Sequence, residues 1–165
     1  MLTTMNCKNR VTAYLLLSLV LFFTATYSAH SSSKSVNIFS ANVISITDGD
    51  TIKVFRENDD ELQQIKIRLY GIDTPEKKQA YGKATTRHLK EILCNPVTVE
   101  TYKTDRYGRT IGVLWCGDEN INMKMVADGY AWAYRRYLSP KSKKETYIAL
   151  EDTARQAGIG LWNDP

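Results

Sequence analysis

The sequence has few of the residues that most often serve as metal ligands and nucleophiles: it contains two histidines and three cysteines in 165 residues. His30 precedes the predicted folded domain, and His88 falls on a predicted helix. We therefore assign neither histidine a role, and the chemistry predicted below depends on carboxylates and guanidinium groups.

The chain also lacks a hydrophobic run long enough to be a clear membrane span. The apolar stretch at residues 11–23 is interrupted by Thr12 and Ser18 and falls short of the roughly 20 residues that a spanning helix needs. Lys8 and Arg10 precede it and small polar residues follow, which is the pattern of a secretory signal. We expect residues 1–29 to be a signal peptide and the protein to be secreted or periplasmic. The alternative is an uncleaved membrane anchor.

Charge of one sign is not in large excess. The formal net charge is +4, and loss of Lys8 and Arg10 with the leader would leave +2. So small an excess does not by itself indicate a nucleic-acid partner; only a local cluster of charge would. The apolar content of 43% and charged content of 24% are those of a folded protein. One domain is predicted at residues 37–165, after a serine-rich lead-in at 30–36.

The hydrophobic pattern predicts a small barrel. Strands are expected at residues 38–46, 52–55, 62–70, 97–101 and 110–115, and helices at 83–93, 122–128 and 142–157. Three strands, a helix and two further strands is the order of an OB-fold. The predicted class is therefore α+β, a five-stranded OB-fold β-barrel with about three packed helices, an architecture that commonly binds nucleic acids or sugar polymers.

Two cysteines, Cys94 and Cys116, remain once Cys7 leaves with the leader. They lie eleven residues on either side of Asp105, at the centre of a predicted hairpin, so they face each other across its two strands. In an exported protein such a pair can form a disulfide. Two separate, half-buried thiols are the equal alternative.

Oxygen ligands gather at the ends of two predicted strands. Residues 67–76 read I-R-L-Y-G-I-D-T-P-E, a strand broken by a turn that carries Asp73, Thr74 and Glu76. Asp50 ends the turn T-D-G-D-T at residues 47–51. If the two strands are neighbours, the carboxylates of Asp50 and Asp73 converge, and with the carbonyl of Thr74 they suit a hard cation such as Ca²⁺. The alternative is that D-G-D is only a hairpin turn.

Two arginines and a glutamate extend this cation site toward phosphate chemistry. Arg68 precedes the acidic turn, and Arg109 begins the last strand. Hydrolysis of a phosphodiester needs positive charge and fork-shaped donors on the phosphate oxygens, together with a group that deprotonates water. The carboxylate of Glu76 can serve as that base. Each arginine alone is most often a solvated surface charge.

The motifs T-D-G-D-T (47–51), I-R-L-Y-G-I-D-T-P-E (67–76) and D-R-Y-G-R (105–109) together resemble the signatures of the staphylococcal-nuclease-like family, the thermonucleases. G-Y-A-W-A-Y-R-R-Y (129–137) and G-I-G-L-W (158–162) are also similar to family members. The resemblance covers about residues 41–162. It implies a calcium-dependent phosphodiesterase that cuts DNA and RNA with little sequence preference and leaves 3′-phosphate ends.

On the matching positions, the resemblance assigns Ca²⁺ binding to Asp50, Asp73 and Thr74. Glu76 would be the general base, and the phosphate would be held by Arg68 and Arg109. The implied substrate contacts are Arg106, Tyr107, Tyr134 and Tyr137; the last two suit packing of the barrel against a helix equally well. No feature of the sequence predicts a stable protein partner, and we expect a monomer.

One feature departs from the family pattern. The loop after Glu76, residues 77–82, is short beside the long loop of the staphylococcal enzyme, so substrate selection and the hold on Glu76 can differ. Lys77 and Lys78 of this loop are candidates for steering a phosphate backbone. The rival reading of the whole chain is a non-catalytic OB-fold module that binds nucleic acid.

Overall fold

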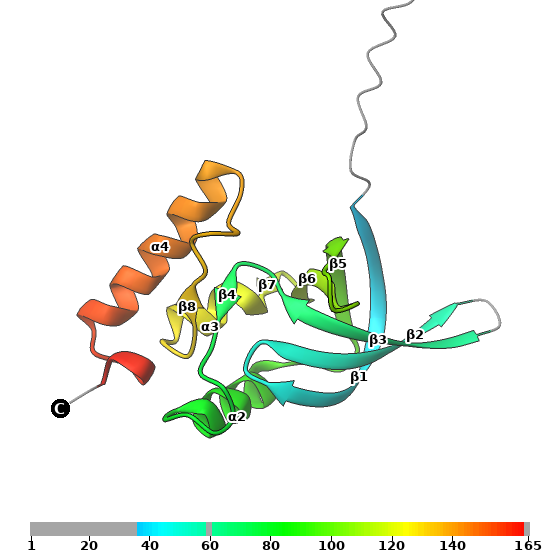
Figure 1. Ribbon diagram of the computed structural model, residues 1–165, viewed down its shortest axis with the longest axis horizontal. Helices are drawn as coiled ribbons and strands as arrows, with labels where there is room; N and C mark the ends of the chain where they lie inside the picture. Colours follow the sequence, from blue (N-terminus) through cyan, green and yellow to red (C-terminus); the bar gives the residue numbers. More distant parts are fainter. Residues whose placement is uncertain (1–35, 59–60, 164–165) are drawn as a thin grey trace, which may run out of the picture. The chain divides into compact units, whose positions relative to one another are not determined.

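The computed structural model describes residues 36–58 and 61–163, and the predicted signal peptide lies outside these ranges. Five strands of the six-stranded main sheet build the barrel (Figure 1): β1 (Asn37–Asp48), β2 (Thr51–Asn58), β3 (Glu61–Leu69), β5 (Val97–Thr104) and β6 (Thr110–Cys116). They lie in the order β3-β2-β1-β5-β6, and parallel pairing of β3 with β6 closes the sheet. The predicted five-stranded barrel is therefore confirmed.

The long strand β1 pairs with two neighbouring strands of the barrel. Its first half, residues 37–41, pairs with β5, and its second half, residues 42–48, pairs with β2. The register between β1 and β2 shifts at two points, between Val43 and Ser45 and between Ile46 and Asp48. Such bulges bend a strand and increase its twist, which allows one strand to serve two neighbours in a closed sheet.

Three α-helices pack on this barrel, as predicted: α2 (Gly82–Ile92), α3 (Ile121–Ala127) and α4 (Lys141–Gln156). A short 3-10 helix, η1 (Gly160–Trp162), follows them. Each α-helix begins and ends one residue before its predicted bounds. For α3 the cause is the cap, because the side chain of Asn120 accepts the backbone N–H of Met123. Among the described helices, none is long and apolar enough to cross a membrane.

Three two-residue strands were not predicted: β4 (Ile72–Asp73), β7 (Glu119–Asn120) and β8 (Trp132–Ala133). Segments this short have no measurable periodicity in the sequence. The antiparallel pair formed by β4 and β8 matters for the site, because it joins the acidic turn to the aromatic segment 130–137. In Figure 1 this pair lies beside α4.

The core lies inside the barrel and beneath the helices. Its fully buried strand residues are aliphatic: Ile52, Val54, Ile67, Leu69, Val97, Val99 and Leu114. Leu89, Ile121, Met125 and Tyr147 complete it from the three helices. A disulfide between Cys94 and Cys116, whose Cα atoms are 5.7 Å apart, ties the chain after α2 to the end of β6.

Candidate active site

The turn between β1 and β2 presents Asp50 to the interior. The Asp50 side chain is buried, and its backbone carbonyl accepts the N–H of Leu69, which fixes the turn against the end of β3. Its backbone N–H donates to Asp48 Oδ1 at 3.1 Å, as in an Asx turn. Its carboxylate accepts the hydroxyl groups of Thr51 (3.0 Å) and Thr74 (3.1 Å), one on each oxygen.

Gly49 makes the close packing of this turn possible. A Cβ at this position would lie 2.1 Å from the Thr85 side chain of α2 and 3.0 Å from Thr74 Oγ1. Only glycine therefore allows the D-G-D turn to rest on both α2 and the turn that follows β4.

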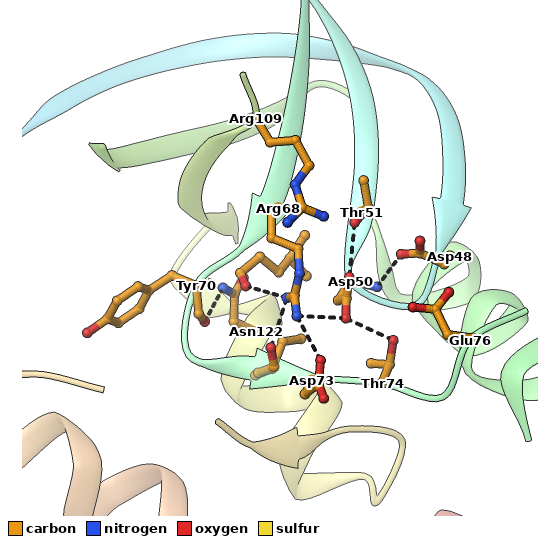
Figure 2. A network of polar contacts seen from close by, with 12 residues as sticks. Asp48, Asp50, Thr51, Arg68, Tyr70, Asp73, Thr74, Glu76, Arg109 and Asn122 are labelled. Carbon is orange, nitrogen blue, oxygen red and sulfur yellow. Dashed lines mark hydrogen bonds and ion pairs between the residues drawn. The ribbon is translucent and has the colours of Figure 1, made fainter. Parts of the chain in front are cut away.

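Arg68 bridges the two predicted cation ligands (Figure 2). Its Nη2 lies 3.1 Å from Asp50 Oδ2 and 2.9 Å from Asp73 Oδ1. Its Nη1 donates to the backbone carbonyls of Leu69 and Ile72, at 2.9 and 2.8 Å. Arg68 is 12% exposed, whereas Asp73 is 49% exposed. One guanidinium is therefore the shared counter-ion of two carboxylates, of which one is buried and one is half-exposed.

Burial and the neighbouring charges also change the pKa of the Asp50 carboxyl. Burial raises the pKa of its carboxyl to about 7, because the loss of solvation outweighs the opposing charge of Arg68. The neighbouring carboxylate of Asp48 acts in the same direction as burial. A cation bound beside Asp50 would favour the ionised carboxylate and act against this rise in pKa.

The oxygen atoms present fit a hard cation. In the chain that the structure describes, no group of three or more His, Cys, Asp or Glu side chains is arranged to hold a metal. Asp50 and Asp73 nevertheless share one counter-ion, and hydroxyl and carbonyl oxygens surround it. Carboxylates and neutral oxygens are the donors that Ca²⁺ takes. Thr74 was assigned as a ligand through its carbonyl; in this structure its hydroxyl donates to Asp50.

Glu76 lies at the rim of the site. Its side chain is exposed, and Figure 2 shows its carboxylate on the same side of the network as Asp48 and Asp50. The short loop holds its backbone, since the N–H of Glu76 donates to the side chain of Gln79 at 2.7 Å and its carbonyl accepts the N–H of Gln79 at 2.8 Å.

Arg109 is held in place by Asp105, four residues earlier. The Asp105 carboxylate accepts Arg109 Nε at 2.8 Å, and it also accepts the backbone N–H groups of Arg109 and Tyr107, both at 2.9 Å. Burial acts to raise the pKa of Asp105, but these donors outweigh it and the pKa is lowered. Gly108, at φ +76°, allows the loop to turn back. Figure 2 shows the Arg109 guanidinium extending toward the space beside Arg68.

The predicted substrate contacts lie on the surface around this centre. The ring of Tyr107 is 68% exposed, with the guanidinium of Arg106 4.7 Å and that of Arg109 5.6 Å from its centroid. Tyr134 and Tyr137 are 36% and 50% exposed, and their rings meet edge to face at 4.8 Å. They follow β8, and the N–H of Tyr134 donates to the carbonyl of Gly71. The β4–β8 pair thus brings these tyrosines near the acidic turn.

Three supporting residues were missed in the sequence. Asp48 and Asp105 had local signals, because each begins a turn that contains glycine and accepts an N–H two residues on. Asn122 had none. It is fully buried in α3, donates to the carbonyls of Tyr70 (2.9 Å) and Gly112 (3.2 Å), and accepts the N–H of Leu114 (3.1 Å). It therefore fastens the chain after Arg68 to β6.

The arrangement offers two carboxylates that could share a cation, two guanidinium groups near one another and an exposed carboxylate at the edge. These groups together can bind a phosphate, neutralise charge that develops on it and orient water. The exposed tyrosines add surfaces on which bases or sugars can stack.

Comparisons with known proteins identify the family to which this chain belongs. Residues 66–164 match the family model described as "Staphylococcal nuclease homologue". An uncharacterized endonuclease of Haemophilus influenzae is 38% identical over 151 residues, covering 91% of this chain and 78% of the relative. A micrococcal nuclease of Shigella flexneri is 39% identical over 137 residues, or 77% and 75% of the two chains. The staphylococcal-like nuclease CAN1 of Arabidopsis thaliana is 35% identical over 118 residues, 71% of this chain and 35% of that protein.

The family match covers more than half of the chain, and the H. influenzae and S. flexneri relatives are aligned over most of their own length. The resemblance inferred from the three sequence motifs is thereby confirmed. This chain belongs to the staphylococcal nuclease homologue family.

Proposed function

We propose that this protein is a nuclease that hydrolyses phosphodiester bonds of DNA and RNA with little sequence preference, depends on Ca²⁺ and leaves 3′-phosphate ends. One observation carries the proposal: Asp50 and Asp73 meet at a single positive group, and Arg109 extends toward the same space. The relatives are named as nucleases and endonucleases, which supports the same reaction class.

In the proposed reaction, the two arginines hold the scissile phosphate. Asp105 occupies Nε of Arg109, while the terminal nitrogens of Arg109 make no hydrogen bond to any residue within 36–58 or 61–163. They are therefore available for a phosphate oxygen. Arg68 can reach the phosphate when its guanidinium gives up part of its contact with Asp50 and Asp73. Fork-shaped donors of this kind bind phosphate oxygens in pairs.

The cation site would consist of Asp50, Asp73 and Thr74. When bound, Ca²⁺ would supply positive charge that offsets the charge developing on the phosphate. Glu76, exposed at the rim, would accept a proton from the attacking water. The water oxygen then bonds to phosphorus while the bond from phosphorus to the 5′-oxygen breaks, and a proton goes to that oxygen. The products are a 3′-phosphate and a 5′-hydroxyl.

Broad specificity follows from the chemistry of the proposed contacts. Arg106 offers charge to a neighbouring phosphate, and the rings of Tyr107, Tyr134 and Tyr137 offer stacking surfaces. Every base has a face that can stack, so neither contact reads sequence.

We also propose that the protein acts outside the cytoplasm. The leader has the pattern of a secretory signal, and a disulfide links Cys94 to Cys116. Fractionation of the cells, with mass spectrometry of the mature N-terminus, tests both cleavage near residue 29 and the compartment. Light scattering of the same preparation tests the expected monomer.

The decisive experiment incubates the purified protein with plasmid DNA and with RNA, in the presence of Ca²⁺ or a chelator. We expect degradation of both substrates with Ca²⁺ only, and products whose 3′-phosphates a phosphatase removes. Binding of nucleic acid without cleavage under any of these conditions would refute the proposal in favour of a non-catalytic module.

A further inference from the structure

A basic groove runs beside α2, outside the site described above. Two adjoining hollows of about 800 and 570 Å³ form it, and they share Lys77, Lys83 and Arg87 in their walls. Lys78 lines the first hollow and Lys90 the second. All five side chains are exposed. The groove starts at the residue directly after Glu76.

The three α2 cations form one stripe. Lys83, Arg87 and Lys90 are spaced four and three residues apart, which places them on one face of the helix. At about 1.5 Å per residue the stripe is about 10 Å long. A row of three cations of this length can contact more than one phosphate of a nucleic-acid strand.

This placement of charge does not favour the helix itself. Lys83 lies in the first turn of α2, where the helix dipole favours anions, and that turn contains no acidic residue. Lys83 and Arg87 are also like charges four residues apart, an arrangement that destabilises a helix. An anionic ligand would relieve both effects.

No acidic side chain offsets these cations within the groove. The residues that line both hollows include no Asp or Glu, and the five cations make no ion pair with any residue in the described part of the chain. Glu91 follows Lys90 on α2 but does not line the groove. Arg68, Arg109 and Arg135, by contrast, each pair with a carboxylate.

The groove also presents an aromatic ring. Tyr81 lines the first hollow, is 42% exposed and has φ +63°, a left-handed conformation that is rare for a bulky residue. Its hydroxyl donates to the carbonyl of Asn163, which fixes the ring at the groove wall. A fixed ring among cations is the combination that binds single-stranded nucleic acid, through stacking and charge.

We propose that the basic groove is an extended binding track for the nucleic-acid strand, one that receives phosphates several nucleotides away from the bond to be cut. The inference depends on the proposed nuclease function for its substrate. An anionic membrane surface is the rival occupant. Nucleic acid is favoured because the surface is concave, contains an aromatic ring and is continuous with Glu76 in the chain.

The test removes two charges far from the catalytic groups, with Arg87→Gln/Lys90→Gln. The control, Lys141→Gln/Lys144→Gln, removes two charges from α4, which does not line the groove. Arg87→Lys/Lys90→Arg keeps the charge and serves as a rescue. All variants are compared with wild type on a trinucleotide and on single-stranded DNA of about 40 nucleotides, several times the 4–16 that one OB-fold covers. Thermal unfolding verifies that each variant is folded.

We expect Arg87→Gln/Lys90→Gln to lower kcat/KM on the long strand about tenfold, through KM, and to leave trinucleotide cleavage within about twofold. Binding of the long strand is measured in chelator by fluorescence anisotropy, from about 50 to about 200 mM salt. The slope of log binding constant against log salt concentration should be about 1.4 smaller in magnitude for Arg87→Gln/Lys90→Gln than for wild type, because two phosphate contacts are lost. The control and the rescue should behave as wild type.

Equal losses on both substrates, or a loss no greater than that of the control, would overturn the track. The track would also be overturned if Arg87→Gln/Lys90→Gln binds DNA as wild type does but no longer sediments with phosphatidylglycerol vesicles. That result would assign the groove to a membrane surface. If wild type binds the long strand through these residues yet cleaves neither substrate, the proposed nuclease function fails while the track remains supported.

Discussion

Removal of the Arg68 guanidinium should destabilise the protein in a way that calcium partly reverses. Arg68 is the shared counter-ion of Asp50 and Asp73 in this structure, at 3.1 and 2.9 Å. In the variant Arg68→Ala the buried carboxylate of Asp50 loses its positive partner. A bound cation would restore that charge, so the cost of the substitution should depend on calcium.

The magnitude follows from the burial of each partner. Loss of one member of a buried pair costs about 3–5 kcal/mol, whereas the half-exposed Asp73 contributes about 0–1 kcal/mol. Asp50 can take up a proton, which keeps the cost near the lower end. We expect a loss of about 3 kcal/mol without calcium, or a fall in Tm of about 10 °C for a domain of this size. With saturating Ca²⁺ the loss should shrink to about 1 kcal/mol, which reflects the carbonyl bonds of Arg68 that a cation does not replace.

The assay is thermal unfolding followed by circular dichroism, with excess chelator and with a Ca²⁺ series. Arg135→Ala is the matched control, because Arg135 pairs at 2.7 Å with Glu151, whose side chain is 4% exposed. It also removes a guanidinium from a buried carboxylate, but at a different place. We expect its loss of stability to be the same in chelator and in calcium.

Two results would refute the reasoning. In the first, Arg68→Ala loses as much stability with saturating calcium as without it, so that no cation replaces the guanidinium. In the second, calcium rescues Arg135→Ala to the same extent, so that the effect is general.

Three further predictions concern the base, the loop that holds Arg109, and the disulfide. Glu76→Gln should lower kcat on plasmid DNA by roughly 10²–10⁴-fold, because the proposed base is lost. Its Tm should be unchanged, since the Glu76 side chain is exposed. Near wild-type turnover in this variant or in Arg109→Ala would contradict the assigned site. The pKa of Asp105 is lowered in the folded protein, so its carboxylate stabilises the fold at pH values above the ordinary Asp pKa of about 4. This contribution to the free energy of unfolding disappears as the pH falls through the lowered pKa. Denaturant unfolding of wild type and Asp105→Asn should therefore differ by about 1 kcal/mol at neutral pH and converge in acid; a constant difference would argue against this. Cys94→Ser/Cys116→Ser removes the disulfide, which closes a loop with a sequence separation of 22, and should lower the free energy of unfolding by about 3 kcal/mol. An unchanged Tm would exclude this value.

The barrel could be predicted from the sequence because its strands alternate clearly and its turns carry glycine, aspartate or proline. Residues such as Ile65, Ile67 and Leu69 recur at the period of a half-buried strand. The two-residue strands β4 and β8 could not be predicted, because their pairing depends on contact between segments about 60 residues apart. That pairing determines where Tyr134 lies relative to Asp73.

The convergence of Asp50 and Asp73 was also predictable, since Asp50 ends the turn before β2 and Asp73 follows β3, the neighbour of β2 in the barrel. The orientation of Arg68 was not. Strand alternation placed it on the polar face, available for a phosphate, whereas the structure directs it to both carboxylates and two carbonyls. The partners of a long flexible side chain are set by tertiary neighbours, and a strand period cannot reveal them. Asn122 is a similar case: its amide satisfies three backbone groups from segments distant in sequence.

The short loop after Glu76 connects the proposed catalytic base to the proposed track. Gln79 closes the loop on Glu76 through two hydrogen bonds, and Gly82 packs so tightly that a Cβ there would lie 2.1 Å from the Glu76 carbonyl. α2 therefore begins directly against the backbone of Glu76. A long loop would separate the helix from the base, whereas this loop makes the cations of α2 continuous with the site. The same shortening thus holds the base and extends the surface that a strand of nucleic acid can follow.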